Sequence, residues 1–411
     1  MRPVRLPPSL RGLPRETFVL ALVAFCVALG FGIVVPAVPL FAAELGVGAT
    51  AAGAVVSAFA LMRLLSGLAA GRLVDRVGER SALLAGLLVV AVSSVLAGLA
   101  ASFPQLLVLR GIGGVGSAVF TIASTSLLLR VAAAAQRGRT QSVYRGGFLL
   151  GGIVGPAFGG AVLGVSLRAP FFLYAGTLLL AALAAATLLP RPPQEELTTQ
   201  VAPGVGEDDG LPRGVVPEPP RTSLRTALAS PTYRAALAGN FAVGFSVLGV
   251  RSTVVPLLVV QGLGLGPGWI GAAFTLSAVV QGVLLLPAGR AVDEIGRRPA
   301  LLTGGLLAAA SLVGLAFATG PVGLLLATAL FAAGAALLGV APAAMVGDVV
   351  EGRGGTAVAV WQMSSDLGSV VGPLAAGLLI DRGSFSLALL VSAAVVGACA
   401  LAALRVPATA G

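Results

Sequence analysis

The chain has 411 residues, of which 57% are hydrophobic and only 10% are charged, with a mean hydropathy of +1.00 and a formal net charge of +10. Soluble globular proteins carry about 25% charged residues, so this composition requires lipid as the main solvent. The sequence contains no histidine, which excludes the zinc sites, haem ligation and activated nucleophiles that depend on it. We therefore expect no enzymatic activity, no metal site and no cofactor. Cys26 and Cys399 lie in apolar runs and are expected to be core residues rather than a disulfide or redox pair.

Apolar stretches of about 20 residues, the length that crosses a bilayer, occur twelve times along the chain. Their ranges are 17–42, 50–71, 81–101, 104–129, 140–165, 168–189, 233–261, 268–288, 299–319, 321–347, 356–380 and 384–404. The first follows an arginine-bearing segment but is too long for a signal peptide, so we interpret it as a retained helix. The pattern predicts an all-α membrane protein with twelve transmembrane helices.

The arginines predict how these spans are oriented. Twenty of the 26 lie in the N-terminal segment, the C-terminal segment and every second connection, whereas only Arg168 and Arg382 lie in the other connections. Positive residues concentrate on the cytoplasmic side, so both termini are expected in the cytoplasm, with the protein in the bacterial cytoplasmic (plasma) membrane. Because the basic charge follows topology, no nucleic-acid partner is expected.

The segment between the second and third spans, GRLVDRVGER at 71–80, combines glycines, arginines and one aspartate. Gly71, Asp75, Arg76, Gly78 and Arg80 resemble the signature loop of the major facilitator superfamily, G-x-L-x-D-R-x-G-x-R. The glycines permit a tight turn, and Asp75 is able to pair with an arginine or cap a helix N-terminus. The resemblance implies a conformational latch, whose contacts hold one state of an alternating-access cycle and break in the other. A turn with positive-inside anchors is the alternative.

The fourth span contains Arg110, followed by glycines at 111, 113, 114 and 116. This partly resembles the family's R-x-x-x-G-x-G segment, whose arginine is linked to proton coupling in antiporters. Arg110 is therefore a proton-coupling candidate. The alternative is an arginine satisfied by neighbouring carbonyls and waters.

The fifth span contains GGFLLGGIVGPAFGG at 146–160. Gly151, Gly155, Pro156, Gly159 and Gly160 match G-x-x-x-G-P-x-x-G-G, which resembles the antiporter signature of the drug:proton branch of the family. Glycines four residues apart share one helix face and allow close approach of another helix, and the proline is expected to bend the helix. The glycines give this helix a smooth face that can rock against a neighbouring helix, and the complete motif favours export. The alternative is a generic packing face of small residues.

A proline-rich stretch at 190–223 holds six of the sixteen acidic residues and is predicted to be a flexible cytoplasmic linker. It divides the chain into an N-terminal six-helix bundle at 1–189, a linker at 190–232 and a C-terminal six-helix bundle at 233–411.

The second half repeats the first. GRAVDEIGRRPALLTG at 289–304 repeats GRLVDRVGERSALLAG at 71–86 with an offset of 218, and SVVGPLAAG at 369–377 repeats GIVGPAFGG at 152–160 with an offset of 217. Common offsets indicate a duplicated unit, and an even number of spans makes the copies parallel repeats. The second copy of the latch contains Gly289, Asp293, Gly296 and Arg297. The second glycine motif has Ala376 where the first has a glycine.

Ionisable side chains at membrane depth mark a pathway or an internal pair. Asp366, near the middle of the eleventh span, is the one carboxylate clearly inside a span. It is the second proton-coupling candidate, and the alternative is a fixed ion-pair partner for an arginine. Arg63 lies too deep to reach the interface, whereas Arg145 is expected to do so by snorkelling.

The cavity candidates are Arg63, Asn240, Arg251, Gln281 and Gln362. Four intramembrane arginines face one aspartate, and the first span carries no acid. This balance disfavours a strictly cationic substrate and favours a neutral, zwitterionic or anionic one.

Together, these patterns predict a monomeric secondary transporter in the lipid bilayer that exports small amphipathic molecules or drugs in exchange for protons. Uptake or facilitated transport of a sugar, organic anion or other metabolite is an alternative on the same fold. A non-transporting membrane receptor is the second alternative.

Overall fold

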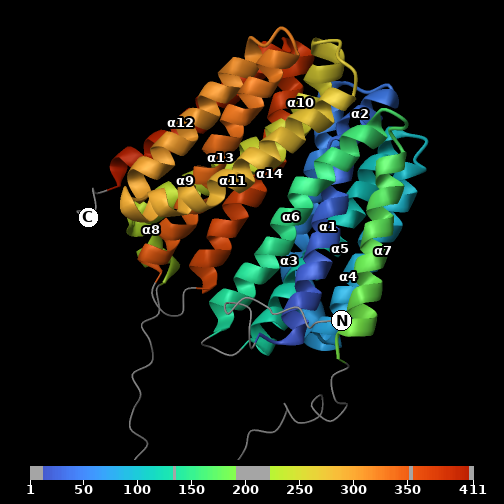
Figure 1. Ribbon diagram of the computed structural model, residues 1–411, viewed down its shortest axis with the longest axis vertical. Coiled ribbons are helices and arrows are strands. Elements are labelled where there is room, and N and C mark those ends of the chain that lie inside the picture. Colours follow the sequence, from blue (N-terminus) through green and yellow to red (C-terminus); the bar gives the residue numbers. More distant parts are fainter. Residues whose placement is uncertain (1–12, 133–135, 191–222, 351–354, 407–411) are drawn as a thin grey trace, which may run out of the picture.

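The computed structural model describes residues 13–132, 136–190, 223–350 and 355–406. Within these residues, twelve helices are long and apolar enough to cross a membrane, which confirms the predicted spans. They form two groups, one on each side of the predicted linker (Figure 1). Helices suit a lipid environment because each satisfies its own backbone hydrogen bonds, so internal glycines and prolines are tolerated there.

The described residues of the first half form seven helices, which make six spans. They are α1 (Arg15–Val34), α2 (Ala37–Glu44), α3 (Ala49–Val77), α4 (Glu79–Gly98), α5 (Phe103–Val131), α6 (Arg137–Leu163) and α7 (Ala169–Leu188). The chain turns at Val35 and Pro36, so α1 and α2 share the first span. α1 packs against α6 and α7, and α5 packs against α3 and α4.

The second half repeats this plan with one departure. Its elements are α8 (Leu224–Ala229), α9 (Pro231–Val243), the π-helical η4 (Gly244–Val250), α10 (Arg251–Leu257), the π-helical η5 (Leu258–Gly262), α11 (Gly268–Glu294), α12 (Arg297–Ala316), α13 (Pro321–Val349), α14 (Gly355–Arg382), α15 (Phe385–Leu401) and the 3-10 turn η6 (Ala402–Arg405). The seventh span is interrupted by the π turns η4 and η5, a feature that is frequent at functional sites.

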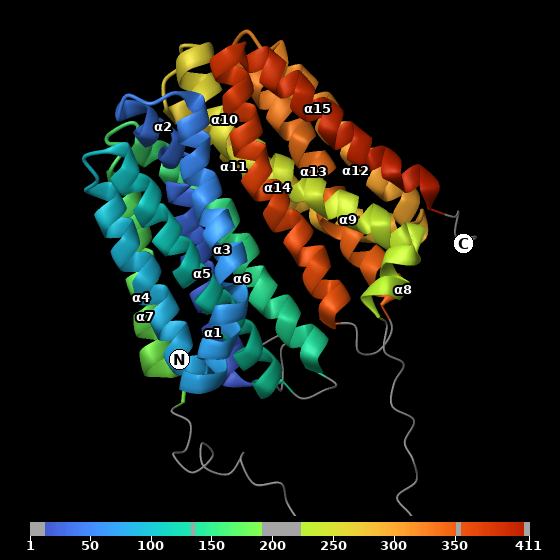
Figure 2. The ribbon, with the colours of Figure 1, turned by 180° about the vertical axis from the view of Figure 1, so that it is seen from behind.

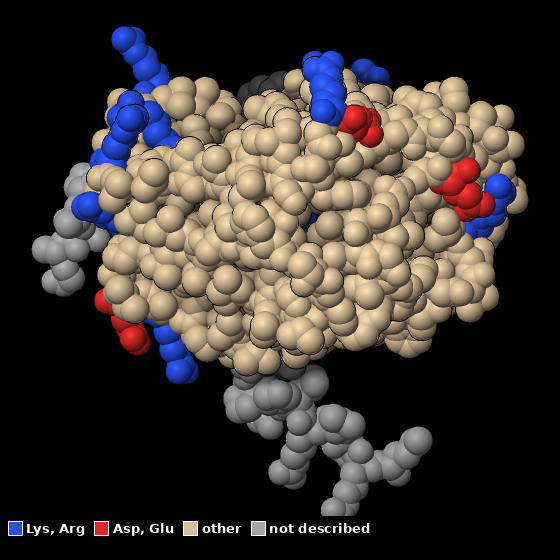
Figure 3. Space-filling view, turned by 90° about the horizontal axis from the view of Figure 1, so that it is seen from above, with Lys and Arg blue, Asp and Glu red and all other residues tan. Residues whose placement is uncertain are grey.

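The two halves touch along two helix pairs, α3 with α14 and α6 with α11, and α10 also contacts α2 and α3. Both ribbon views show the halves close together at the end where α2 and α10 lie and spread apart at the opposite end (Figures 1 and 2). Following the predicted orientation, we call these the outer and inner ends. Seen from above, the outer end is largely uncharged, and most charged side chains lie at its margin (Figure 3).

Part of the orientation and domain predictions falls beyond the described residues. Arg2, Arg5, Arg11, Arg191, Arg213, Arg221 and Arg353 lie outside them, as does most of the predicted linker. The described end of that linker contains α8. The cytoplasmic placement of the termini and the bundle boundaries stay predictions.

Candidate functional site

An ion pair joins the two halves at mid-depth of the predicted membrane. The guanidinium of Arg63, near the middle of α3, donates to the carboxylate of Asp366 on α14, a residue 303 positions away in sequence. The two side chains are 34% and 20% exposed. A charge that faced lipid would be costly, so this exposure indicates contact with water between the halves. The partner of Asp366 is therefore Arg63 and not Arg110.

Further contacts continue from this pair toward the outer end. The hydroxyl of Ser57 donates to the carbonyl of Val370 at 2.7 Å. Gly53 lies against the backbone of Pro373 so closely that a Cβ atom would overlap it. We call the line of contacts between α3 and α14, from Arg63 and Asp366 to the outer end, the polar seam.

Arg110 lies inside the first half and makes no contact with Asp366. It is 6% exposed, and its guanidinium lies over the ring of Phe59 at 4.6 Å from the ring centroid. Its Nε atom has no hydrogen-bond partner among the described residues. The two proton-coupling candidates are thus separated, and Arg110 is a buried cation held by an aromatic face.

Arg251 is held in a similar way inside the second half. Its guanidinium donates to the hydroxyl of Ser277 at 2.9 Å and lies over the rings of Phe274 and Phe331 at 4.6 and 5.5 Å. Among the described residues, no carboxylate pairs with either Arg110 or Arg251.

The predicted amides do not form one cluster with these arginines. Asn240 on α9 donates to the carbonyl of Trp361 at 2.6 Å, which joins α9 to α14 within the second half. Gln362 is exposed and Gln281 is half-buried, and neither makes a side-chain hydrogen bond with a described residue. Arg145 is exposed near the beginning of α6, where snorkelling was expected.

The segment at 71–80 is mostly helical rather than a loop. α3 continues to Val77, and only Gly78, with a φ of 80°, forms the turn. In the second copy α11 likewise continues past Gly289, and Gly296 turns with a φ of 106°. The tight turn that the glycines permit is therefore made by Gly78 and Gly296, whose positive φ favours glycine, whereas Gly71 and Gly289 lie inside helices.

The predicted latch residues differ in their contacts. Asp75 and Asp293 are exposed, and neither carboxylate has a partner among the described residues. Arg80 donates to the carbonyl of Ala186 on α7, and Arg297 pairs with Asp348 at 3.0 Å within the second half. Arg76 is exposed at the end of α3. Both aspartates are therefore free for a contact formed in another state.

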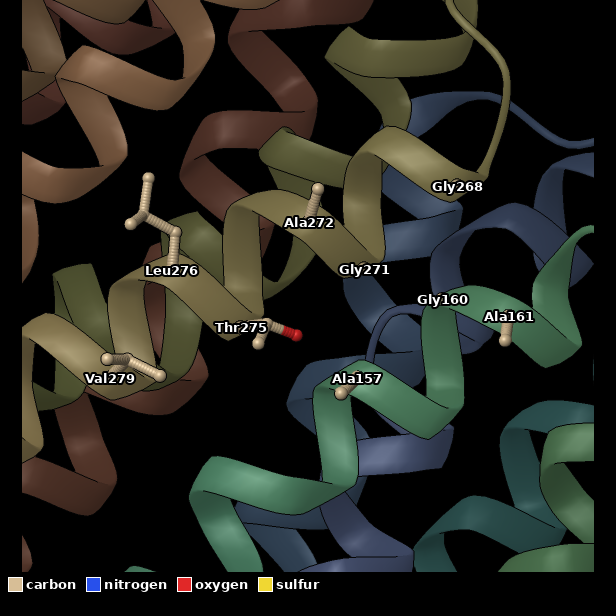
Figure 4. A pocket seen from close by; sticks show the side chains of 9 residues that line it. All are labelled: Ala157, Gly160, Ala161, Gly268, Gly271, Ala272, Thr275, Leu276 and Val279. Atoms are coloured by element: carbon tan, nitrogen blue, oxygen red, sulfur yellow. The ribbon is translucent and has the colours of Figure 1, made fainter.

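The glycine motif of α6 faces two different neighbours. Gly151, Gly155 and Gly159 lie against the backbone of α1 within the first half, and Pro156 flanks Gly32 of α1. Gly160 instead lies against Gly271 of α11 in the other half, and a Cβ atom on either residue would overlap its partner (Figure 4). The motif thus serves packing within one half and, through Gly160, contact between the halves.

Two polar contacts between the halves were missed from the sequence, the hydrogen bond of Ser57 and a contact made by Asp381. The carboxylate of Asp381, in the last turn of α14, accepts hydrogen bonds from the backbone N–H groups of Ala49 and Thr50 at 2.8 Å each. The sequence offers no signal for this pairing, because Asp381 lies just beyond the predicted eleventh span and its partners are backbone atoms.

The fold and this charged interface define a secondary transporter, a multi-pass protein of the bacterial cytoplasmic membrane built from two repeated six-span halves. The sequence profile of the Major Facilitator Superfamily matches residues 20–267 and 236–410. The chain belongs to the Major Facilitator Superfamily.

Relatives within this family include drug-resistance proteins. The chain is 27% identical to "Multidrug resistance protein 2" of Bacillus subtilis (strain 168) over 362 residues, which cover 87% of this chain and 86% of the relative. It is 30% identical to "Quinolone resistance protein NorA" of Staphylococcus aureus (strain MRSA252) over 189 residues, 45% of this chain and 47% of the relative.

Solved structures share the fold at low sequence identity. An inward-facing, unoccupied bacterial homologue of the human lysosomal transporter Spinster superposes with a TM-score of 0.75 at 16% identity, covering 98% of both chains. The peptide transporter POT superposes with a TM-score of 0.74 at 15% identity, covering 96% of this chain and 94% of that one.

Proposed function

We propose that this protein exports small amphipathic, drug-like molecules in exchange for protons by alternating access. The observation that carries the proposal is the ion pair between Arg63 and Asp366, because it places a titratable carboxylate on the interface that must open and close. The names of the relatives, multidrug and quinolone resistance, support the class of substrate and the outward direction.

Proton movement is coupled to closure of the outer end through this pair. When the outer ends separate, Asp366 loses Arg63 and accepts a proton from the outer side. When the halves close again, pairing with Arg63 requires the ionised carboxylate, so the proton leaves toward the inner side. Without substrate and with Asp366 ionised, the ion pair keeps the outer end closed. This prevents the protein from opening outward without transporting a molecule.

The substrate loosens the pair when it binds between the halves, and binding thereby drives outward opening. Arg110 and Arg251 lack carboxylate partners among the described residues, which supports neutral, zwitterionic or anionic substrates over strictly cationic ones. Segments 71–80 and 289–297 form the latch at the inner end when the outer end opens. The cycle uses a small molecule and protons, catalyses no reaction, requires no cofactor or metal, and needs one copy of the chain in the bilayer.

A proton-flux assay in proteoliposomes tests the proposal. Candidate compounds, including a quinolone and a lipophilic cation, are added to vesicles containing a pH-sensitive dye and either wild-type protein, Asp366→Asn or Glu44→Gln. Glu44 is an exposed acid at the end of α2 with no partner among the described residues, so it is the matched control.

We expect compound-dependent proton flux with the wild type and the Glu44→Gln control, and at least a tenfold loss with Asp366→Asn. Full coupled flux in Asp366→Asn would contradict the role of Asp366. Compound movement without proton flux would instead favour facilitated transport, and no movement of any compound would favour a receptor.

A further inference from the structure

Asp381 connects the two halves at the outer end of the polar seam. Its carboxylate accepts the N–H groups of Ala49 and Thr50, the first two residues of α3, although Asp381 itself belongs to α14 of the other half. The free N–H groups at a helix N-terminus are normally satisfied by a side chain that directly precedes the helix. Here the other half supplies this cap, and its negative charge also suits the positive end of the helix dipole.

Gly48 leaves room for this arrangement. It occupies the N-cap position of α3 and provides no side-chain cap. A Cβ atom at Gly48 would lie 2.9 Å from both carboxylate oxygens of Asp381. The φ of Gly48 is −72°, which any residue adopts, so the requirement for glycine comes from space and not from backbone strain.

One helical turn before Asp381, Gly377 brings the two helices together. It lies against the backbone of Ala49 and Thr50 so closely that a Cβ atom would overlap them. The cap therefore sits on a close helix contact, which fixes the carboxylate against the end of α3.

In the part of the chain that the structure describes, the equivalent interface between α6 and α11 lacks these polar contacts. By the repeat offsets, Gly164 stands where the second half has Asp381, and Leu149 stands where it has Asp366. Thr275 is the counterpart of Ser57, and its hydroxyl has no hydrogen-bond partner among the described residues. α11 begins after Pro267 without a side-chain cap.

The α6 and α11 interface instead borders an open crevice. The crevice has a volume of about 590 Å³ and is lined by small and apolar residues that include Ala157, Gly160, Gly271, Thr275 and Val279 (Figure 4). Two repeats related by pseudo-symmetry thus meet along one polar seam and one apolar contact.

We infer that Asp381 is a positioning residue of the transport cycle, which holds the outer end closed by capping α3 of the opposite half and releases that cap when the outer end opens. The inference rests on the proposed alternating-access cycle. Because the polar seam alone carries such a cap among the described residues, the closed outer state depends on Asp381 more than on any side chain at the α6 and α11 crossing.

Distances between spin labels at the outer end test this inference without any substrate. Cys26→Ala and Cys399→Ala provide a cysteine-free background, and Val165→Cys and Phe317→Cys place one label on each half. Both label positions are highly exposed, at 87% and 69%, and follow α6 and α12 at the outer end. Electron paramagnetic resonance then measures the ratio of separated to closed outer ends in lipid nanodiscs.

We expect Asp381→Ala to raise this ratio about tenfold, the effect of losing one helix cap, and Asp381→Asn to raise it less, because one amide oxygen still accepts a backbone N–H group. Gly48→Ala should produce a similar shift, because it displaces the carboxylate while keeping its charge. The double variant should shift the ratio no further than either single variant, since both remove the same contact.

Two matched variants separate this effect from general perturbation. Glu44→Gln removes an acidic side chain at the outer end that caps no described helix. Gly67→Ala adds a methyl group to α3 where no atom lies within 4 Å. Neither should change the distance distribution. An unchanged distribution in both Asp381→Asn and Asp381→Ala would overturn the inference, and if these variants do not fold, an unchanged distribution in Gly48→Ala would overturn it.

The outer distance tests the Asp381 cap, whereas the compound-driven proton flux tests the proposed function, so the two can fail separately. A shift of the outer distance together with absent compound-driven proton flux supports the Asp381 cap and rejects proton-coupled export. Normal flux in the wild type together with an unshifted distance in the Asp381 variants rejects the cap and retains export.

Discussion

The ion pair between Arg63 and Asp366 stabilises two charges at a membrane depth where either charge alone would be unfavourable. An unpaired arginine or aspartate at the centre of a transmembrane helix costs about 3 kcal/mol by insertion measurements. Pairing across the halves offsets this penalty only while α3 and α14 stay in contact. The closed outer state is thereby tied to the contact between these two side chains.

Breaking this pair from the arginine side should destabilise the protein. Arg63→Gln leaves Asp366 without its counter-charge and is expected to lower the free energy of unfolding by about 1–3 kcal/mol. A thermal unfolding curve of the purified protein should show a melting temperature several degrees lower. The exchanged double variant Arg63→Asp with Asp366→Arg should recover most of the loss.

The matched control for this measurement is Arg145→Gln, which removes an exposed arginine near the inner end of α6. It should melt close to the wild-type temperature. An Arg63→Gln variant as stable as this control would show that the ion pair contributes nothing to the closed state.

Arg110 and Arg251 show a second way to keep a cation inside a helical bundle. Each guanidinium lies over one or two phenylalanine rings, and a cation–π contact of this kind contributes about 0.5–2 kcal/mol. The positive charge stays unneutralised by any described carboxylate. This agrees with the preference for neutral, zwitterionic or anionic substrates that we propose.

At the scale of the helices, the glycine motif of α6 has two separable roles. Gly151 faces the backbone of α1 within one half, whereas Gly160 faces Gly271 of α11 across the interface. Gly152, between them in sequence, has no atom within 4 Å of the position of a Cβ atom. An alanine at each of these three positions would therefore place a methyl group on a different surface of α6: the one facing α1, the one facing α11 and an open one.

Three alanine variants should separate these roles. Gly151→Ala should lower the melting temperature, because its methyl group would overlap α1 within a folded bundle. Gly160→Ala should keep a near wild-type melting temperature but raise the ratio of separated to closed outer ends and reduce compound flux about tenfold. Gly152→Ala should change neither property.

The informative comparison is between the melting temperatures and outer-end distances of Gly151→Ala and Gly160→Ala. If Gly160→Ala lost stability as Gly151→Ala does and left the outer distance unchanged, α6 would serve packing alone. The link between the motif and the transport cycle would then be lost.

The helices themselves were predictable, and their partners were not. Hydropathy alone located the twelve spans, because each must be apolar over the bilayer thickness. The turn glycines Gly78 and Gly296 followed from the repeat, whereas the helical positions of Gly71 and Gly289 did not, since a helix is able to continue beyond the membrane. The pairing of Arg63 with Asp366 depends on how α3 meets α14, and no local pattern encodes that contact.

At the scale of the whole molecule, a duplicated chain produces two similar interfaces with different chemistry. The repeat offsets relate Arg63 to Gln281 and Asp381 to Gly164, so the charges of the polar seam have no counterparts between α6 and α11. The repeat was visible in the sequence. Which of the unmatched residues meet follows only from the fold, because they are far apart in the chain.

We propose that the ionised Asp366, through its pair with Arg63, holds the outer end closed. The most direct test is the distance between labels at Val165→Cys and Phe317→Cys, measured without substrate for the wild type and for Asp366→Asn. Asparagine cannot form the ion pair, so we predict about a tenfold rise in the ratio of separated to closed outer ends. An Asp366→Asn variant with the distance distribution of the wild type would show that Asp366 does not hold the outer end closed.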